Sequence, residues 1–196
     1  MPLGEPGAAV GCLLASRQNG GSLPRRRKDP MNRLELALSQ ITAARDYTLG
    51  LLADIPLQDW FRQPAEGVTH VAWQVGHLAF AEYRLALERV RGPRPEDAEL
   101  ASPEFLKLFG RDSVPNVDPA CYPPAAEIRA TFDRVHAQVL HDLPLVPDTD
   151  LDLPSVVFHK LFDTRLGALL WCSRHEMLHA GQIGLLRRLS GSKPLW

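Results

Sequence analysis

The sequence predicts an all-α protein built as a four-helix bundle. Apolar residues recur at helical spacing in four long segments, proline and glycine separate these segments, and no segment shows the strict alternation of a half-buried strand. The chain has 196 residues, of which 45% are hydrophobic and 23% charged. One domain with a sizeable core is therefore expected.

The first two helices are predicted from apolar periodicity and from their end signals. The first spans about 32–54 and ends before Pro56, because a proline disfavours helical geometry in the residue before it. The second runs from an N-cap at Thr69 to Arg91, just before a Gly-Pro pair. A connection over 92–124 follows, with seven prolines and one short helix in its middle.

The last two helices complete the expected bundle. The third opens at the proline pair 123–124 and ends near Leu143, with its apolar residues on one narrow stripe. The fourth runs from about Phe162 to Ser190, with Gly191 at the usual position after a helix end.

The N-terminal segment, residues 1–30, is predicted to be a disordered extension. It contains five glycines, four prolines and five basic residues but no aromatic side chain, so it cannot bury enough apolar surface to offset the entropy of ordering it. The bundle domain is accordingly expected over residues 31–192.

Composition restricts the expected partners and location. With 22 basic and 23 acidic residues the net charge is −1, which argues against a nucleic-acid binder. No apolar stretch approaches the roughly 18 residues of a membrane-spanning helix. Three cysteines without a CxxC pair indicate a reducing compartment, and we expect the cytoplasm. A small-molecule substrate is the expected partner, and a homodimer is left open.

The most informative motif lies on the fourth predicted helix. His175 and His179 are four residues apart, so their imidazoles emerge on the same face and can chelate one metal ion. With Glu176 between them, they match the H-E-x-x-H pattern of zinc proteases. Residues 180–196 contain no Asp, Glu or His, however, so the further ligand of those proteases is missing and a third ligand must come from upstream.

Five upstream histidines are candidates for the third ligand: His70, His77, His136, His141 and His159. His77 is preferred because it lies two turns inside the second helix, between Trp73 and Phe80. His141 falls on the outer face of the third helix and His136 on its flank, and His159 falls in a loop or at the start of the fourth helix. The alternative to a metal site is that the inward histidines only form hydrogen bonds.

Two sequence segments together resemble a known family. Trp73-Gln74-Val75-Gly76-His77-Leu78-Ala79, followed by His175-Glu176-x-x-His179-Ala180-Gly181-Gln182-Ile183, looks like the DinB-like (YfiT-like) metalloenzyme superfamily of four-helix bundles. The resemblance covers about residues 31–192. It implies that His77, His175 and His179 are a metal triad, and that the activity is a thiol-dependent S-transfer, a thiol-dependent isomerisation or a hydrolysis.

The metal expected at such a site is divalent, with zinc or nickel preferred and iron not excluded by three imidazoles. Three neutral ligands leave a coordination position open, which is typical of a catalytic site. A low-molecular-weight thiol is a further expected cofactor, by the resemblance.

The neighbouring residues keep two interpretations each. Glu176 is either a general base, or a residue that supports a metal ligand without binding the metal, or a surface residue. Gln182 either orients a ligand or caps a buried carbonyl. Cys172 is expected to be a small buried hydrophobe rather than a fourth ligand. Trp73 and Trp171 either pack in the core or form a substrate wall.

The predicted function is a metal-dependent transferase or hydrolase acting on a small molecule. Two other classes stay open: a bundle that binds metal or a ligand without turnover, and a helical interaction module without metal. Metal binding separates the last from the other two, and turnover separates the enzyme from the binder.

Overall fold

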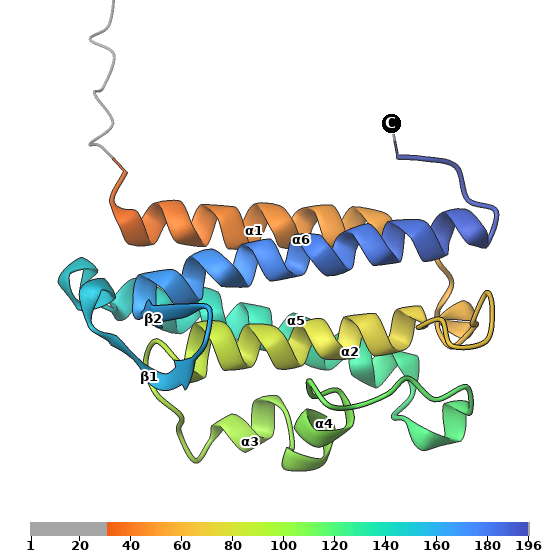
Figure 1. Cartoon of the computed structure of the whole chain (residues 1–196), viewed down its shortest axis with the longest axis horizontal. Helices are drawn as coiled ribbons and strands as arrows, with labels where there is room; N and C mark the ends of the chain where they lie inside the picture. Colours follow the sequence, from red (N-terminus) through yellow and green to blue (C-terminus); the bar gives the residue numbers. More distant parts are fainter. Residues whose placement is uncertain (1–30, 196) are drawn as a thin grey trace, which may run out of the picture. The chain divides into compact units, whose positions relative to one another are not determined.

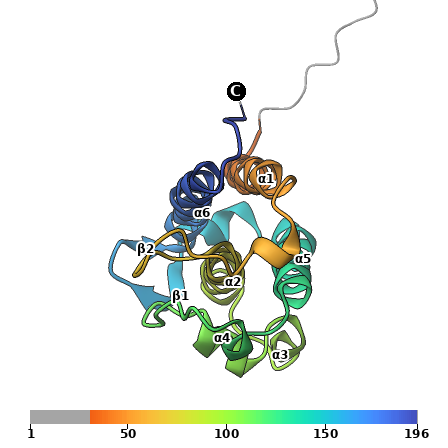
Figure 2. The same cartoon turned by 90° about the vertical axis from the view of Figure 1, so that its right-hand side faces the viewer.

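The computed structural model describes residues 31–195, so the predicted disorder of residues 1–30 lies outside the described part of the chain. Four long helices form the bundle (Figures 1 and 2): α1 (Arg33–Leu52), α2 (Val71–Glu82), α5 (Ala125–Asp142) and α6 (Arg165–Leu189). The predicted all-α four-helix class is confirmed. The helix ends lie within three residues of the predicted ones, except at the end of the second helix.

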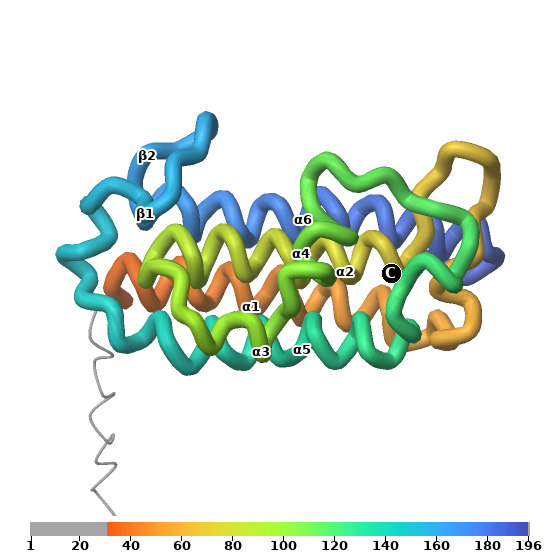
Figure 3. Tube along the Cα trace, turned by 90° about the horizontal axis from the view of Figure 1, so that it is seen from below, coloured from red at the N-terminus to blue at the C-terminus, as the bar shows by residue number. Residues whose placement is uncertain are grey.

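The four helices run in two parallel pairs. Helices α1 and α6 lie side by side and run in one direction, whereas α2 and α5 run in the opposite direction (Figures 1 and 3). Because α2 and α5 are consecutive long helices with the same direction, the chain must return along the bundle between them. The proline-rich stretch makes this return, and it carries two short helices, α3 (Asp97–Leu100) and α4 (Pro103–Leu108), where one was predicted.

Helix starts follow from local hydrogen bonds. Asn32 and Glu35 form a reciprocal capping box at α1, and Thr164 caps α6 by accepting from the backbone N–H of Gly167. The start of α2 was predicted one residue too early, since His70 and not Thr69 is the N-cap. Its Nδ1 accepts from the backbone N–H of Trp73 at 3.1 Å, in place of the usual hydroxyl or carboxylate oxygen.

The second helix does not continue as an α-helix to Arg91. At Tyr83–Glu88 it becomes a π-helix, in which hydrogen bonds skip one more residue. Such wider turns occur often at functional sites, and Arg84 and Leu85 from this turn line the cavity described below.

A small antiparallel hairpin precedes α6 and was not predicted. Strands β1 (Pro154–His159) and β2 (Phe162–Thr164) pair with an irregular register. Side chains of β1 alternate between exposed and half-buried, the pattern of a strand with one covered face. The hairpin is tied to the bundle because the backbone N–H of Val156 donates to the carbonyl of Arg89 at 2.9 Å.

The core between the helices is mostly apolar but contains a buried ion-pair network. Its centre is Arg45 on α1, which is 1% exposed. Arg45 bonds the carboxylates of Glu82 on α2 and Glu176 on α6, and it also donates to the Phe132 carbonyl on α5. The network therefore joins all four long helices. No helix of residues 31–195 is long and apolar enough to cross a membrane.

Candidate metal centre

The structure brings His77, His175 and His179 together between α2 and α6. The ligand atoms that the three imidazoles can offer lie within 4.8 Å of one another. Ring centroids are 5.3 Å apart for His77 and His175, 4.7 Å for His77 and His179, and 4.5 Å for the pair on α6. Zinc lies about 2.0–2.1 Å from an imidazole nitrogen, so the three nitrogens would have to approach one another further to share one ion.

Helix geometry explains this convergence. His175 and His179 are one turn apart on α6 and face α2, which runs antiparallel to it. His77 lies near the middle of α2, so it meets both α6 histidines at the same level. Trp73, one turn before His77, stacks on its ring with centroids 4.8 Å apart and an angle of 11° between the planes, which fixes the plane of the imidazole.

The proton of the His77 ring is fixed by a backbone carbonyl. Nδ1 of His77 lies 2.8 Å from the carbonyl oxygen of Phe109. A carbonyl can only accept, so Nδ1 carries the proton and donates it, and the lone pair of the neutral ring is on Nε2. The close approach of Phe109 depends on Gly76, because a Cβ there would overlap the Phe109 ring.

The position of the proton on the His179 ring is fixed by the side-chain amide of Gln74, which is hydrogen-bonded in turn to Gln182. Nδ1 of His179 lies 2.6 Å from Oε1 of Gln74, whose Nε2 donates to Oε1 of Gln182 at 2.9 Å and to the Thr69 hydroxyl at 3.2 Å. Because the Gln74 amide nitrogen is used by these two acceptors, its oxygen faces His179 and accepts the Nδ1 proton. Nε2 of His179 thus also holds a free lone pair.

His175 has no such partner. Its Nδ1 is buried and forms no hydrogen bond within the described residues, and an unsatisfied buried polar atom costs about 1–3 kcal/mol. A ligand in contact with the ring would remove this cost or offset it. The orphaned nitrogen and the two directed Nε2 lone pairs fit a metal ion better than they fit a set of histidines that only form hydrogen bonds.

The three rings are neutral at ordinary pH. Burial, and after it charge repulsion from neighbouring histidines, lowers the pKa of His175 to about 4 and that of His179 to about 3. Burial also lowers the pKa of His77, against the opposing effect of its bond to Phe109. Neutral imidazole is the form that binds a metal, so the site needs no deprotonation to accept one.

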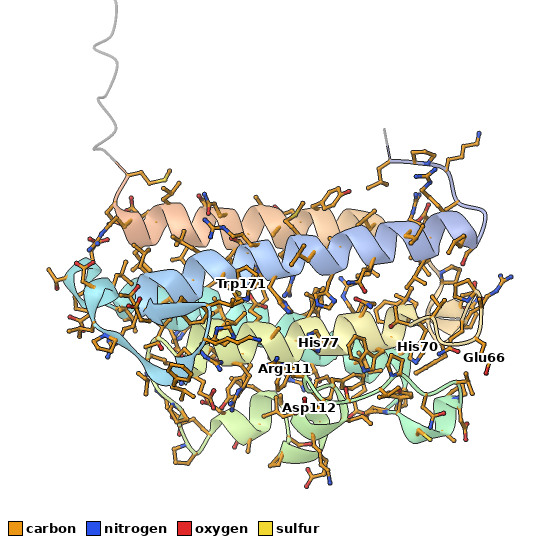
Figure 4. All side chains as sticks on the ribbon, in the orientation of Figure 1. Glu66, His70, His77, Arg111, Asp112 and Trp171 are labelled. Carbon is orange, nitrogen blue, oxygen red and sulfur yellow. The ribbon has the colours of Figure 1, made fainter. Side chains whose placement is uncertain are left out.

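A cavity of about 360 Å³ opens beside the cluster. Trp171 on α6, His77 on α2 and Arg111 on the return loop all line it and lie in one region of Figure 4. His175 contributes to the same wall, so the cavity reaches the histidine cluster. Both interpretations of Trp171 hold in the structure, because it packs against the apolar core and also lines the cavity.

The other predicted neighbours are placed clearly. Glu176 is 3% exposed and both its oxygens contact Arg45, so it belongs to the buried network and not to the histidine cluster. The surface position considered for it is wrong. Gln182 is exposed, and it accepts from the Gln74 amide that orients the His179 ring. Cys172 is a buried hydrophobe, and burial raises the pKa of its thiol well above the ordinary value.

The remaining histidines lie outside the cluster. His70 is buried at the start of α2, and His141 is exposed, as predicted. His136 bonds Glu82 at 2.7 Å. His159 was expected in a loop or at the start of a helix, but it is the last residue of β1 and lines the cavity.

Three features beside the histidine cluster were not predicted from the sequence: the hydrogen bond of Gln74, the packing of Phe109 against Gly76, and the hairpin. Gln74 and Gly76 are inside the segment that carried the family resemblance. Their signal was therefore present, but the partners that explain it, Gln182 and Phe109, are 108 and about 30 residues away in the chain.

These features define a class of protein: a four-helix bundle with a three-histidine cluster that can hold a metal between two antiparallel helices. The model of the DinB superfamily matches residues 40–183, so the chain belongs to this superfamily. Among curated proteins, no sequence matches the chain significantly.

Proposed function

We propose that this protein is a metal-dependent enzyme that transfers a small thiol, or hydrolyses a small substrate, at a site made by His77, His175 and His179. The observation that carries the proposal is the pair of directed rings: the Nδ1 protons of His77 and His179 are held by Phe109 and Gln74, which leaves both Nε2 lone pairs free beside the orphaned His175. The cavity at the cluster gives room for a substrate.

When bound, a divalent metal such as zinc or nickel supplies Lewis acidity, which eases deprotonation of a water or a thiol. The chain's own residues do the rest. Phe109 and Gln74 keep the two rings in one tautomer, Trp73 holds the plane of His77, and Trp171 covers one side of the cavity. In the thiol reaction the sulfur forms a bond to the substrate carbon, the leaving group departs with its electron pair, and the thiol proton passes to water.

The first test is metal content. The protein is equilibrated with zinc or nickel, and bound metal is measured for the wild type and for His77→Ala, His175→Ala and His179→Ala, with the exposed His141→Ala as control. One ion per chain in wild type and control, and a strong loss in the three site variants, is expected. Unchanged metal content in His77→Ala would show that the wrong third ligand was chosen.

The second test is turnover. The metal-loaded protein is assayed for thiol addition to 1-chloro-2,4-dinitrobenzene and for ester hydrolysis of 4-nitrophenyl acetate, before and after chelation. Metal-dependent turnover that His175→Ala abolishes supports an enzyme. Stoichiometric metal without turnover in either assay would favour a bundle that binds metal without catalysis, and absence of bound metal would favour an interaction module.

Two further proposals concern the location and the oligomeric state of the protein. The free thiols of Cys121 and Cys172 support a reducing location such as the cytoplasm. A homodimer is proposed only as an assembly to be measured by sedimentation, because exposed apolar residues on α6 such as Leu178 and Leu185 provide apolar surface for one.

A further inference from the structure

The cavity wall next to the histidine cluster carries an excess of positive charge. Four cationic side chains line it, Arg84, Arg89, Arg111 and Lys160, and no carboxylate does. They come from three separate places in the chain: the π-helix with the residue that caps its end, the return loop, and the tip of the hairpin. A wall assembled from three distant segments is a property of the folded cavity and not of one charged stretch.

Only part of this charge is neutralised within residues 31–195. Arg84 pairs with Glu88, and Arg89 lies 3.8 Å from the other oxygen of the same carboxylate. One carboxylate thus serves two arginines. Neither Arg111 nor Lys160 takes part in an ion pair among the described residues.

One arginine of the wall has an unsatisfied donor. Nε of Arg89 is buried and forms no hydrogen bond within the described residues, so the neighbouring Glu88 does not satisfy the whole guanidinium group. His159 adds a neutral donor, because its Nδ1 accepts from the backbone N–H of Leu161 at 3.2 Å, which leaves the ring proton on Nε2. Burial lowers the pKa of His159, and the positive charges of Arg89, Arg111 and Lys160 lower it as well.

We propose that the small molecule bound beside the metal is an organic anion that carries one or more carboxylates, held by Arg111 and Lys160 with Arg84 and Arg89 behind them. This rests on the proposed function and specifies its substrate class. Guanidinium groups match carboxylates in shape and charge, and a cleft lined by one sign of charge concentrates molecules of the other sign. The cavity volume of about 360 Å³ corresponds to roughly a dozen water-sized groups, which suits a small acid.

The test compares a neutral with an anionic thiol. The zinc-loaded protein is titrated by calorimetry with 2-mercaptoethanol and with mercaptosuccinate, which adds two carboxylates to the thiol. The variant Arg111→Ala/Lys160→Ala is chosen because both residues are exposed, whereas removing Arg84 or Arg89 would take one of its two cationic partners from the buried Glu88 and threaten the fold. Arg62→Ala/Lys107→Ala, an exposed pair outside this cavity, is the matched control.

The wild type and the control are expected to bind mercaptosuccinate at least tenfold more tightly than 2-mercaptoethanol, and the site variant is expected to lose most of this preference. The advantage should also fall as salt is raised. Equal binding of the two thiols by the wild type, or a preference that survives in the site variant, would overturn the anion proposal while leaving the metal site intact.

A second measurement does not depend on the metal. Succinate is titrated into the chelated protein and followed by NMR chemical-shift changes of residues around the cavity. Binding that weakens several-fold in Arg111→Ala/Lys160→Ala, but not in the control, supports the proposal even if no metal binds. If the chelated wild type shows no succinate binding, or if the site variant binds succinate as tightly as the wild type, the cationic wall does not bind organic anions and the proposal is overturned.

Discussion

Gln74 gives the sharpest test of how the site is held, because it touches a ring of the cluster without being able to replace it. The perturbation is Gln74→Leu, which keeps the side chain's approximate size but removes the acceptor for Nδ1 of His179 and the donor for Gln182. Gln74 is 0% exposed, so water cannot easily replace the lost partner.

The magnitude follows from the bond removed. A buried donor left without an acceptor costs about 1–3 kcal/mol, and the ring is also freed to rotate or to change its tautomer. Since about 1.4 kcal/mol is tenfold in an equilibrium constant, zinc affinity should fall by roughly one order of magnitude. This agrees with the tenfold to hundredfold losses typical when a hydrogen-bond partner of a metal ligand is removed.

The assay is competition for zinc against a chelator of known affinity, at pH 7.5, with circular dichroism to confirm that each variant is folded. Gln74→Glu keeps an acceptor for His179 and should retain or raise the affinity, whereas a role in packing alone predicts that Glu is worse than Leu. Gln40→Leu, an exposed glutamine on α1, is the control. A Gln74→Leu protein that binds zinc as tightly as this control would refute the reasoning.

Three further predictions follow from the same geometry. Gly76→Ala should destabilise the fold by about 1–3 kcal/mol through overpacking and weaken metal binding, because the new Cβ displaces Phe109, whereas Gly181→Ala on α6, with open space around it, should be neutral or slightly stabilising in denaturant unfolding. In metal-free protein the lowered pKa values of His175 and His179 mean that the unfolded chain binds more protons, so stability should be constant above about pH 6.5 and fall below it, by up to ~1.4 kcal/mol per pH unit for each histidine; urea melts between pH 7.5 and 4.5 that show no such fall would contradict this. Chelation should leave helicity in circular dichroism unchanged and lower the melting temperature, since ligand at a hundred times its Kd adds about 2.7 kcal/mol; complete unfolding would make the metal structural.

The long helices could be predicted from the sequence because their signals are local. Apolar spacing, capping residues and prolines act within a few residues, and they place α1, α5 and α6 within three residues of their ends. The convergence of His175 and His179 is equally local, since a separation of four residues fixes one face of a helix.

The direction of inward faces was predicted less well. At about 100° per residue, Gln182 and Leu189 fall within roughly 60° of His175 and would be buried with it, but Gln182 is exposed and Leu189 is 58% exposed. The buried stripe of α6 is instead centred nearer Glu176, which packs against Arg45 on α1. The spacing of apolar residues reflects the combined effect of all neighbouring helices and does not say which helix each residue contacts. Helix α6 contacts α1 along its length and meets α2 only along one edge, where the histidines lie.

The hairpin and the charged wall could not be predicted from the sequence. The strand at 154–159 has six residues beside a proline- and aspartate-rich loop, too short for alternation to stand out from irregular chain. The wall joins Arg84, Arg111 and Lys160, which no spacing rule relates. Both features depend on long-range packing and so become visible only in the folded chain.

The glutamate of the H-E-x-x-H pattern has a different role here from its role in a zinc protease. In a bundle whose metal-binding face looks toward α2, the residue after His175 is rotated by about 100° and enters the core between α6 and α1. There Glu176 is held by Arg45, and burial raises the pKa of its carboxyl although Arg45 acts in the opposite direction. Removing one partner of such a buried pair costs about 3–5 kcal/mol, so Glu176 serves the stability of the bundle through the ion pair that joins the helices.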